Sequence, residues 1–98
     1  MERKEPIQDW TQDMVLSALR EKGITLRELA IQMGYAGSSF YGVFKRDSYL
    51  AYEQCIAQFL GYDVEDIWPV RVAVRREKAE RRARSLLEAK AMAARQVA

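Results

Sequence analysis

The sequence predicts an all-α protein, in which a bundle of four to five short helices precedes a helical C-terminal tail. Three observations support this fold class. Apolar residues recur at helical spacing, glycine or proline follows these runs, and no segment alternates like a strand. A chain of 98 residues corresponds to about one domain. We therefore expect a folded domain at residues 9–70 and a basic helical extension at residues 71–98.

The first two expected helices have recognisable start and stop signals. Asp9 is expected to cap the first helix, which ends at Gly23. Its apolar face comprises Trp10, Met14, Val15, Ala18 and Leu19. The second helix begins with a capping box of Thr25 and Glu28 and ends before Gly34. Its apolar face comprises Leu26, Leu29, Ala30 and Met33.

A third helix is predicted within GYAGSSFYGVFKRD, residues 34–47, from about residue 37 or 38 to Lys45. Ser38 or Ser39 is available as its N-cap. Its inward-facing residues are Phe40, Val43 and Phe44. Gly42 lies within this helix although glycine is a poor helix residue, so a requirement other than packing must explain it.

The remaining helices complete the expected core. The fourth helix carries an inner stripe of Tyr52, Cys55, Ile56, Phe59 and Leu60, and Gly61 ends it. Asp63 is expected to cap a final turn at residues 64–68, and Pro69 prevents that helix from continuing unchanged. Trp10 and Trp68 are expected as core anchors, and Cys55 as a small buried hydrophobe.

The second and third helices are joined by a turn of about three residues, 34–36, which is the arrangement of a helix-turn-helix. In that motif the second helix packs one face inward and lies in the major groove with the other. The outer stripe comprises Ser38, Tyr41, Gly42 and Lys45. A small Gly42 would let DNA approach closely. Similar helical corners also occur in all-α proteins that do not bind DNA, so the geometry alone leaves both interpretations open.

Composition and charge disfavour several other classes of protein. The absence of histidine removes the commonest general base and metal ligand, the single Cys55 has no disulfide partner in the chain, and we find no catalytic constellation. No enzyme activity, cofactor or small-molecule ligand is therefore expected. There is no apolar run of about 18 residues and no signal-peptide core at the start, so we expect a cytoplasmic protein with no membrane contact.

The charge is divided unevenly along the chain. Residues 1–70 hold 7 Lys+Arg against 11 Asp+Glu, a net charge of −4, whereas residues 71–98 hold 9 against 3, a net charge of +6. The positive charge available to a nucleic acid is therefore concentrated in the tail.

Two sets of residues resemble known regulators. Leu29, Ala30, Met33, Gly34, Tyr35, Phe40 and Val43 match the spacing of lambda-repressor-like helix-turn-helix proteins. Residues 9–71, with DW at 9–10, GYA at 34–36 and IWP at 67–69, resemble the Ner-type regulators of Mu-like phages and their bacterial Ner-like relatives. This resemblance implies a lambda-repressor-like fold and a sequence-specific transcriptional regulator, a repressor of phage-type early promoters that associates with the bacterial nucleoid.

The resemblance also implies which residues bind double-stranded DNA. The recognition helix and its entrance would contribute Ala36, Gly37, Ser38, Ser39, Tyr41, Gly42 and Lys45. Phosphate contacts are expected from Thr25 and Arg27 at the start of the second helix, and from Arg46 and Ser48 in the loop after the third.

The tail after Arg71 lies outside this resemblance, and its composition predicts a helix. Three uses remain open: a solvated extension, a helix for self-association or for a partner, and a basic arm along DNA. The last is favoured by a cluster of Arg75, Arg76, Lys78, Arg81, Arg82 and Arg84. An alternative function follows from the second use: a protein-interaction module or transcriptional activator whose C-terminal helix recruits a partner.

Overall fold

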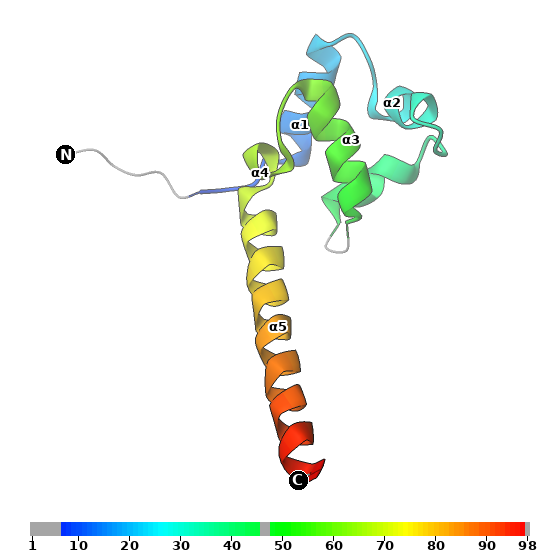
Figure 1. Cartoon of the computed structure of the whole chain (residues 1–98). Helices are drawn as coiled ribbons and strands as arrows, with labels where there is room; N and C mark the ends of the chain where they lie inside the picture. The colour runs from blue at the N-terminus through cyan, green and yellow to red at the C-terminus, as the bar shows by residue number, and fades with distance from the viewer. Residues whose placement is uncertain (1–6, 46–47, 98) are drawn as a thin grey trace, which may run out of the picture.

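The computed structural model describes residues 7–45 and 48–97, in which short helices form a body and one long helix projects from it (Figure 1). Its elements are α1 Gln12–Glu21, α2 Leu26–Gln32, the 3-10 helix η1 Ser39–Phe44, α3 Leu50–Leu60, α4 Val64–Ile67 and α5 Pro69–Val97. The described residues contain no strand. The predicted all-α fold is confirmed.

The core forms where the apolar faces of the short helices meet. Its buried members are Val15, Leu19, Leu26, Leu29, Ala30, Phe40, Val43, Ile56, Ala57, Leu60, Ile67 and Trp68. Trp68 is thus confirmed as a core anchor, whereas Trp10 is half-buried and packs against the core from outside. Met14 and Met33 were wrongly expected on inner faces, since they are 48% and 44% exposed.

The start of α2 is as predicted. The Thr25 hydroxyl accepts a hydrogen bond from the Glu28 backbone N–H at 3.1 Å, and the Glu28 carboxylate accepts one from the Thr25 N–H at 3.0 Å. The expected cap of α1 is wrong, because Thr11 and not Asp9 accepts a hydrogen bond from the Met14 N–H, at 3.2 Å. Thr11 directly precedes the helix, which brings its hydroxyl within reach of the first turn.

Asp9 instead caps α5, which follows it by about sixty positions in the chain. Its Oδ1 accepts hydrogen bonds from the backbone N–H groups of Val70 at 2.8 Å and Arg71 at 3.4 Å. Pro69 is the first residue of α5 and has no N–H to satisfy. The Trp10 N–H also donates to the Ile67 carbonyl at 2.8 Å. The DW and IWP sequences therefore lie against each other.

The third helix is shorter and tighter than expected. It is a 3-10 helix, and Ser38 stands at its N-cap position without a side-chain capping bond, so the predicted serine cap is wrong. Bonds such as Lys45 N–H to the Gly42 carbonyl, at 3.0 Å, close its turns. The connection from α2 runs through residues 33–38 and is longer than the predicted turn. Gly34, at φ +88°, makes the sharp reversal that ends α2.

The end of α3 is as expected, with Gly61 in the left-handed conformation at φ +85°. Pro69 interrupts the preceding helix as expected, because α4 ends at Ile67 and Trp68 leaves the helical conformation at φ −124° and ψ 61°, and the proline is then the first residue of the next helix, α5. Pro69–Val97 is one continuous helix. The expected domain boundary after residue 70 falls inside it and stays a prediction.

Glu53 anchors α5 to the body. Its side chain is fully buried on α3, where its Oε2 accepts hydrogen bonds from Arg71 and Arg75, each at 2.8 Å. Burial by itself raises the pKa of this carboxyl, but the hydrogen bonds from Arg75 and Arg71 outweigh that effect and hold the pKa below its ordinary value. The same contact raises the pKa of Arg75.

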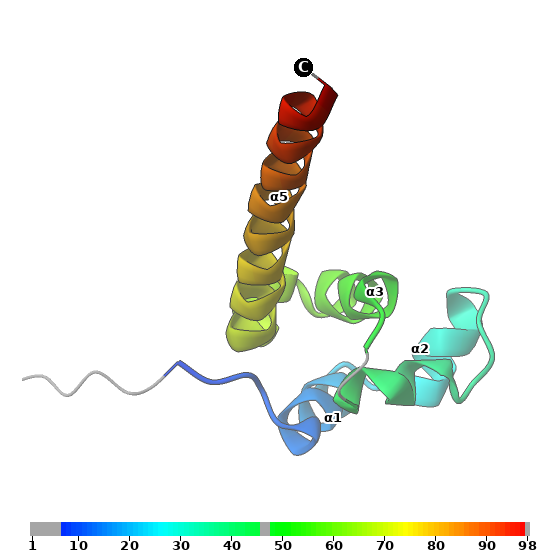
Figure 2. The same ribbon diagram turned by 90° about the horizontal axis from the view of Figure 1, so that it is seen from below.

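Beyond this anchor, α5 leaves the body. Every side chain from residue 77 to residue 96 is exposed. Both views show the C-terminal end of α5 far from the short helices (Figures 1 and 2). The first turns of α5 thus belong to the packed structure, and the remainder is an extended surface.

Candidate nucleic-acid interface

The 3-10 helix η1 presents two different faces. Phe40 and Val43 are fully buried, and the Phe40 ring packs against Tyr52 with centroids 5.2 Å apart. On the other side Tyr41 is 42% exposed, and the side chains of Ser38 and Lys45 are also exposed. This is the two-faced arrangement expected of a helix that reads the major groove.

Gly42 is not required by the packing of the protein. Its φ is not positive, and a Cβ placed on it would meet no atom within 4 Å. Space for a side chain therefore exists on the outer side of η1. The absence of a side chain here leaves room for a partner to approach the backbone.

Gly37 has the opposite environment. A Cβ at this position would lie 2.8 Å from Cγ of Arg27, so the side chain of Arg27 lies directly against the entrance of η1. Exposed Ala36 precedes it, and half-buried Ser39 follows at the start of η1. The structure thus brings the start of α2 and the entrance of η1 together, as the predicted DNA-binding set requires.

Thr25 and Tyr41 also lie near each other. Both line a surface pocket of about 400 Å³ between α1, α2 and η1. The Thr25 hydroxyl accepts the capping hydrogen bond of α2, and its backbone N–H and carbonyl are also bonded within the helix start, so the hydroxyl proton is what it can still donate to a phosphate. Two of the predicted phosphate contacts, Thr25 and Arg27, therefore lie beside the predicted reading residues.

The loop after η1 is placed differently from expectation. The Ser48 hydroxyl is buried, and the Ser48 carbonyl accepts a hydrogen bond from Arg75 at 3.2 Å. Ser48 is thus held against α5, while its neighbour Tyr49 is 70% exposed. Arg46 lies outside the described residues.

A groove that the sequence did not predict lies along the junction of this loop and α5. It has a volume of about 740 Å³. Its lining comprises Asp9, Ser48, Tyr49, Val70, Arg71, Val74, Arg75 and Lys78. No local pattern reveals this groove, because its walls come from three distant segments.

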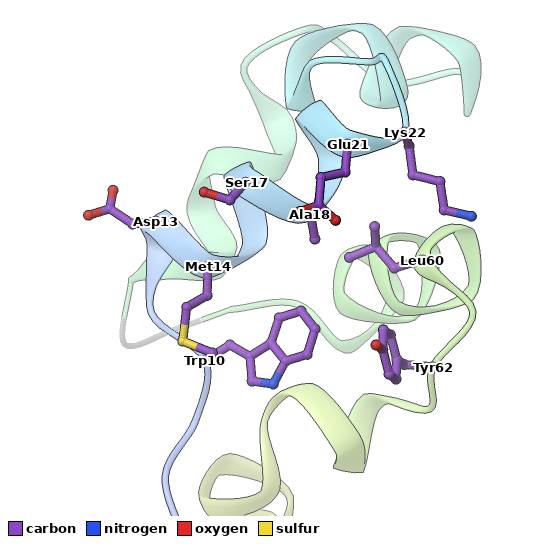
Figure 3. A pocket seen from close by; sticks show the side chains of 9 residues that line it. All are labelled: Trp10, Asp13, Met14, Ser17, Ala18, Glu21, Lys22, Leu60 and Tyr62. Carbon is purple, nitrogen blue, oxygen red and sulfur yellow. The ribbon is translucent and has the colours of Figure 1, made fainter.

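A separate hollow of about 650 Å³ lies between α1 and the end of α3 (Figure 3). The Trp10 and Tyr62 rings meet edge to face in it, with centroids 5.2 Å apart. Asp13 points away from these rings (Figure 3). The Ser17 hydroxyl in this hollow accepts a hydrogen bond from Arg20, and no hydrogen bond among the described residues joins it to Asp13 or Glu21, so the geometry gives no support to a catalytic role.

The described part of the chain shows neither a candidate metal site nor a helix that could span a membrane. Residues 7–45 and 48–97 bring together no group of three His, Cys, Asp or Glu side chains that could hold a metal ion. None of the helices described there has the length and apolar character of a membrane span.

Residues 9–84 match the model of the winged helix-turn-helix DNA-binding family, which covers most of the chain. The match begins at Asp9 and continues along α5, past the end of the Ner-type resemblance at Arg71. A strand-built wing is not found among the residues that the structure describes. No curated protein matches the sequence.

Proposed function

The chain belongs to the winged helix-turn-helix DNA-binding family, and we propose that it is a sequence-specific transcriptional regulator that binds double-stranded DNA. The observation that carries this proposal is the two-faced η1. Its buried face fixes it to the core, and its exposed face offers a hydroxyl-bearing ring at Tyr41, a charge at Lys45 and open space at Gly42. These are the features that a helix needs to enter the major groove.

We assign base contacts to η1 and phosphate contacts to its surroundings. Ser38, Ser39 and Tyr41 offer hydroxyl groups to base edges or phosphates. Arg27 and the N-terminal backbone of α2 are placed for phosphates. The exposed face of η1 carries no Arg, Asn or Gln that could make a bidentate base contact. Much of the specificity is therefore expected from DNA shape and from binding of more than one copy.

The finer proposal, that the protein is a Ner-type repressor of phage-type early promoters, rests on the resemblance described above. Contact between two of its signature sequences supports it. The Trp10 N–H donates to Ile67, and Asp9 caps α5 beside Pro69. These residues therefore act as one structural unit that holds the end of the domain.

The test replaces two residues of the reading face, Ser39→Ala with Tyr41→Ala. Footprinting on DNA adjacent to the gene first defines the operator. The double variant should then bind that operator about 1–3 kcal/mol more weakly, with nearly unchanged binding to random duplex.

The matched control is Ser17→Ala with Tyr62→Ala, which removes the same groups from the hollow beside α1. Tyr62 is 45% exposed, close to the 42% of Tyr41. The control should keep the ratio of specific to non-specific affinity. An unchanged ratio in the Ser39/Tyr41 variant would refute η1 as the reading helix.

A second candidate function is a protein-interaction module, and one observation favours it. Leu86, Leu87 and Met92 on α5 are 56%, 67% and 55% exposed. Salt dependence distinguishes the two functions. A protein that makes about six phosphate contacts loses roughly a thousandfold in DNA affinity between about 50 and 200 mM salt, whereas an apolar protein interface hardly responds.

A further inference from the structure

We propose that the DNA backbone continues from η1 into the groove beside α5, where Lys78 and Arg82 bind its phosphates. This inference rests on the proposed function and adds a second contact surface to it. Three features of the structure support it: the position of the groove, the difference between basic residues that pair with carboxylates and those that do not, and the attachment of α5 to the body.

The groove lies between the loop that follows η1 and the first turns of the tail helix. Its loop wall, Ser48 and Tyr49, comes soon after Lys45 at the end of η1. Its opposite wall is α5, as far as Lys78. The exposed Tyr49 hydroxyl can donate a hydrogen bond to a phosphate between these walls. A strand that leaves the surface of Lys45 therefore meets α5 at Lys78.

The arginines nearest the body already have partners. Arg71 and Arg75 both bind the buried Glu53 carboxylate. They position α5, and their hydrogen bonds are used within the protein. The predicted basic cluster thus contains at least one residue, Arg75, whose first role is structural.

The next basic residues of α5 are of two kinds: some pair with a carboxylate, and others do not. Arg81 binds Glu77 at 3.0 Å, and Arg76 lies 3.7 Å from a carboxylate oxygen of Glu65. Neither Lys78 nor Arg82 pairs with any carboxylate within residues 7–45 and 48–97. These two exposed side chains are four positions apart and so lie on one face of α5. They are the cations that follow directly from the groove.

The attachment of α5 makes this surface a rigid one. The Asp9 cap and the Glu53 contacts fix the first two turns of the helix in direction. Lys78 is only one turn beyond Arg75, so its position is set by this anchor. Because the helix backbone that carries these cations is already fixed, only their side chains lose conformational freedom when they bind phosphate.

Charge favours DNA over a second copy of this helix as the occupant. Residues 71–98 carry a net charge of +6, so two such helices repel each other. The sequence of α5 also offers only a weak apolar seam for pairing, which Lys90 interrupts: Ala79, Ala83, Leu86 or Leu87, Ala94 and Val97. Duplex DNA carries the opposite charge at regular spacing.

The experiment compares two double variants of the full chain, Lys78→Ala with Arg82→Ala and, as control, Lys90→Ala with Arg95→Ala. Each removes one exposed lysine and one exposed arginine from α5. Affinity for a random duplex is measured from about 50 to 200 mM salt. Losing two phosphate contacts should reduce the slope of log affinity against log salt by about 1.8. The control should keep the wild-type slope.

Each outcome has a distinct meaning. A wild-type protein that binds no duplex would contradict the proposed function itself. Wild-type binding with an unchanged slope in the Lys78/Arg82 variant would overturn this inference and leave the proposed function standing. An equal loss of slope in the control would also overturn it, because general charge and not this groove would then be responsible. Circular dichroism verifies that both variants keep their helix content.

Discussion

At the scale of single residues, the glycines of this protein occupy their positions for different physical reasons. Gly23, Gly34 and Gly61 have positive φ values and end helices. Gly42 has neither a positive φ nor a neighbour that a Cβ would strike. A residue that the fold does not require is a good candidate for a functional requirement.

The variant Gly42→Ala tests this requirement. Stability should stay the same or rise by up to about 1 kcal/mol, because alanine lowers the entropy of the unfolded chain. Operator affinity should fall, because the methyl group occupies the space of the approaching DNA. Denaturant unfolding and equilibrium binding measure the two effects.

Gly23→Ala is the opposite control. At φ +80° an alanine should cost about 1–2 kcal/mol of stability without changing DNA affinity in the folded protein. Full operator affinity in Gly42→Ala would mean that DNA does not approach η1 at this point.

At the scale of elements, α5 depends on a residue at the other end of the folded chain. The α5 N-terminus begins with Pro69, and the first free N–H groups are those of Val70 and Arg71. Asp9 accepts both, and its charge also interacts favourably with the positive end of the helix dipole. The segment before α1 therefore stabilises the last helix.

Replacing Asp9 should loosen the start of α5. We expect Asp9→Ala to lower the free energy of unfolding by about 0.5–2 kcal/mol, the usual cost of losing a cap. Amide hydrogen exchange at Val70 and Arg71 should accelerate. Asp9→Asn keeps a capping oxygen and should restore most of the protection. Unchanged exchange in Asp9→Ala would show that this hydrogen bond is dispensable.

At the scale of the whole molecule, Glu53 joins the helix-turn-helix body to the tail. Breaking one partner of a buried ion pair is costly, although here both arginines remain partly exposed to water, at 22% and 35%. We expect Glu53→Gln to destabilise the protein by about 2–3 kcal/mol at neutral pH. Glu77→Gln, which breaks an exposed pair on α5, should cost less than about 1 kcal/mol.

The same contact predicts the direction of a pH effect. The pKa of Glu53 is lower in the folded protein, so its contribution is complete above the unfolded-state pKa of about 4.3 and disappears as pH falls through the folded value. Glu53→Gln should therefore lose less stability on acidification than the wild type. The measurement is urea unfolding at several pH values. Equal losses of unfolding free energy in the variant and the wild type would contradict this role of the ionised Glu53.

Local sequence signals predicted much of the body. The Thr25–Glu28 capping box, the glycine at the end of α3 and most of the apolar stripes act over one or two turns, and the structure contains them. The predicted bounds of the third helix, from about residue 37 or 38 to Lys45, lie close to those of η1, but the 3-10 geometry was not predicted. Hydrogen-bond spacing in so short a helix depends on the packing of Phe40 and Val43, which is not a local property.

The sequence by itself determined that this chain is a helical helix-turn-helix protein with a basic tail. Apolar periodicity, helix caps and charge clusters each depend on residues that are close together in the chain. Only the tertiary structure decided what Asp9, Glu53, Arg71 and Arg75 do. Their partners lie 18 to 62 positions away, and folding alone brings them together. The same folding sets Lys78 beside the loop after η1. Local patterns specify helices, but the surface that two distant segments share exists only after they pack.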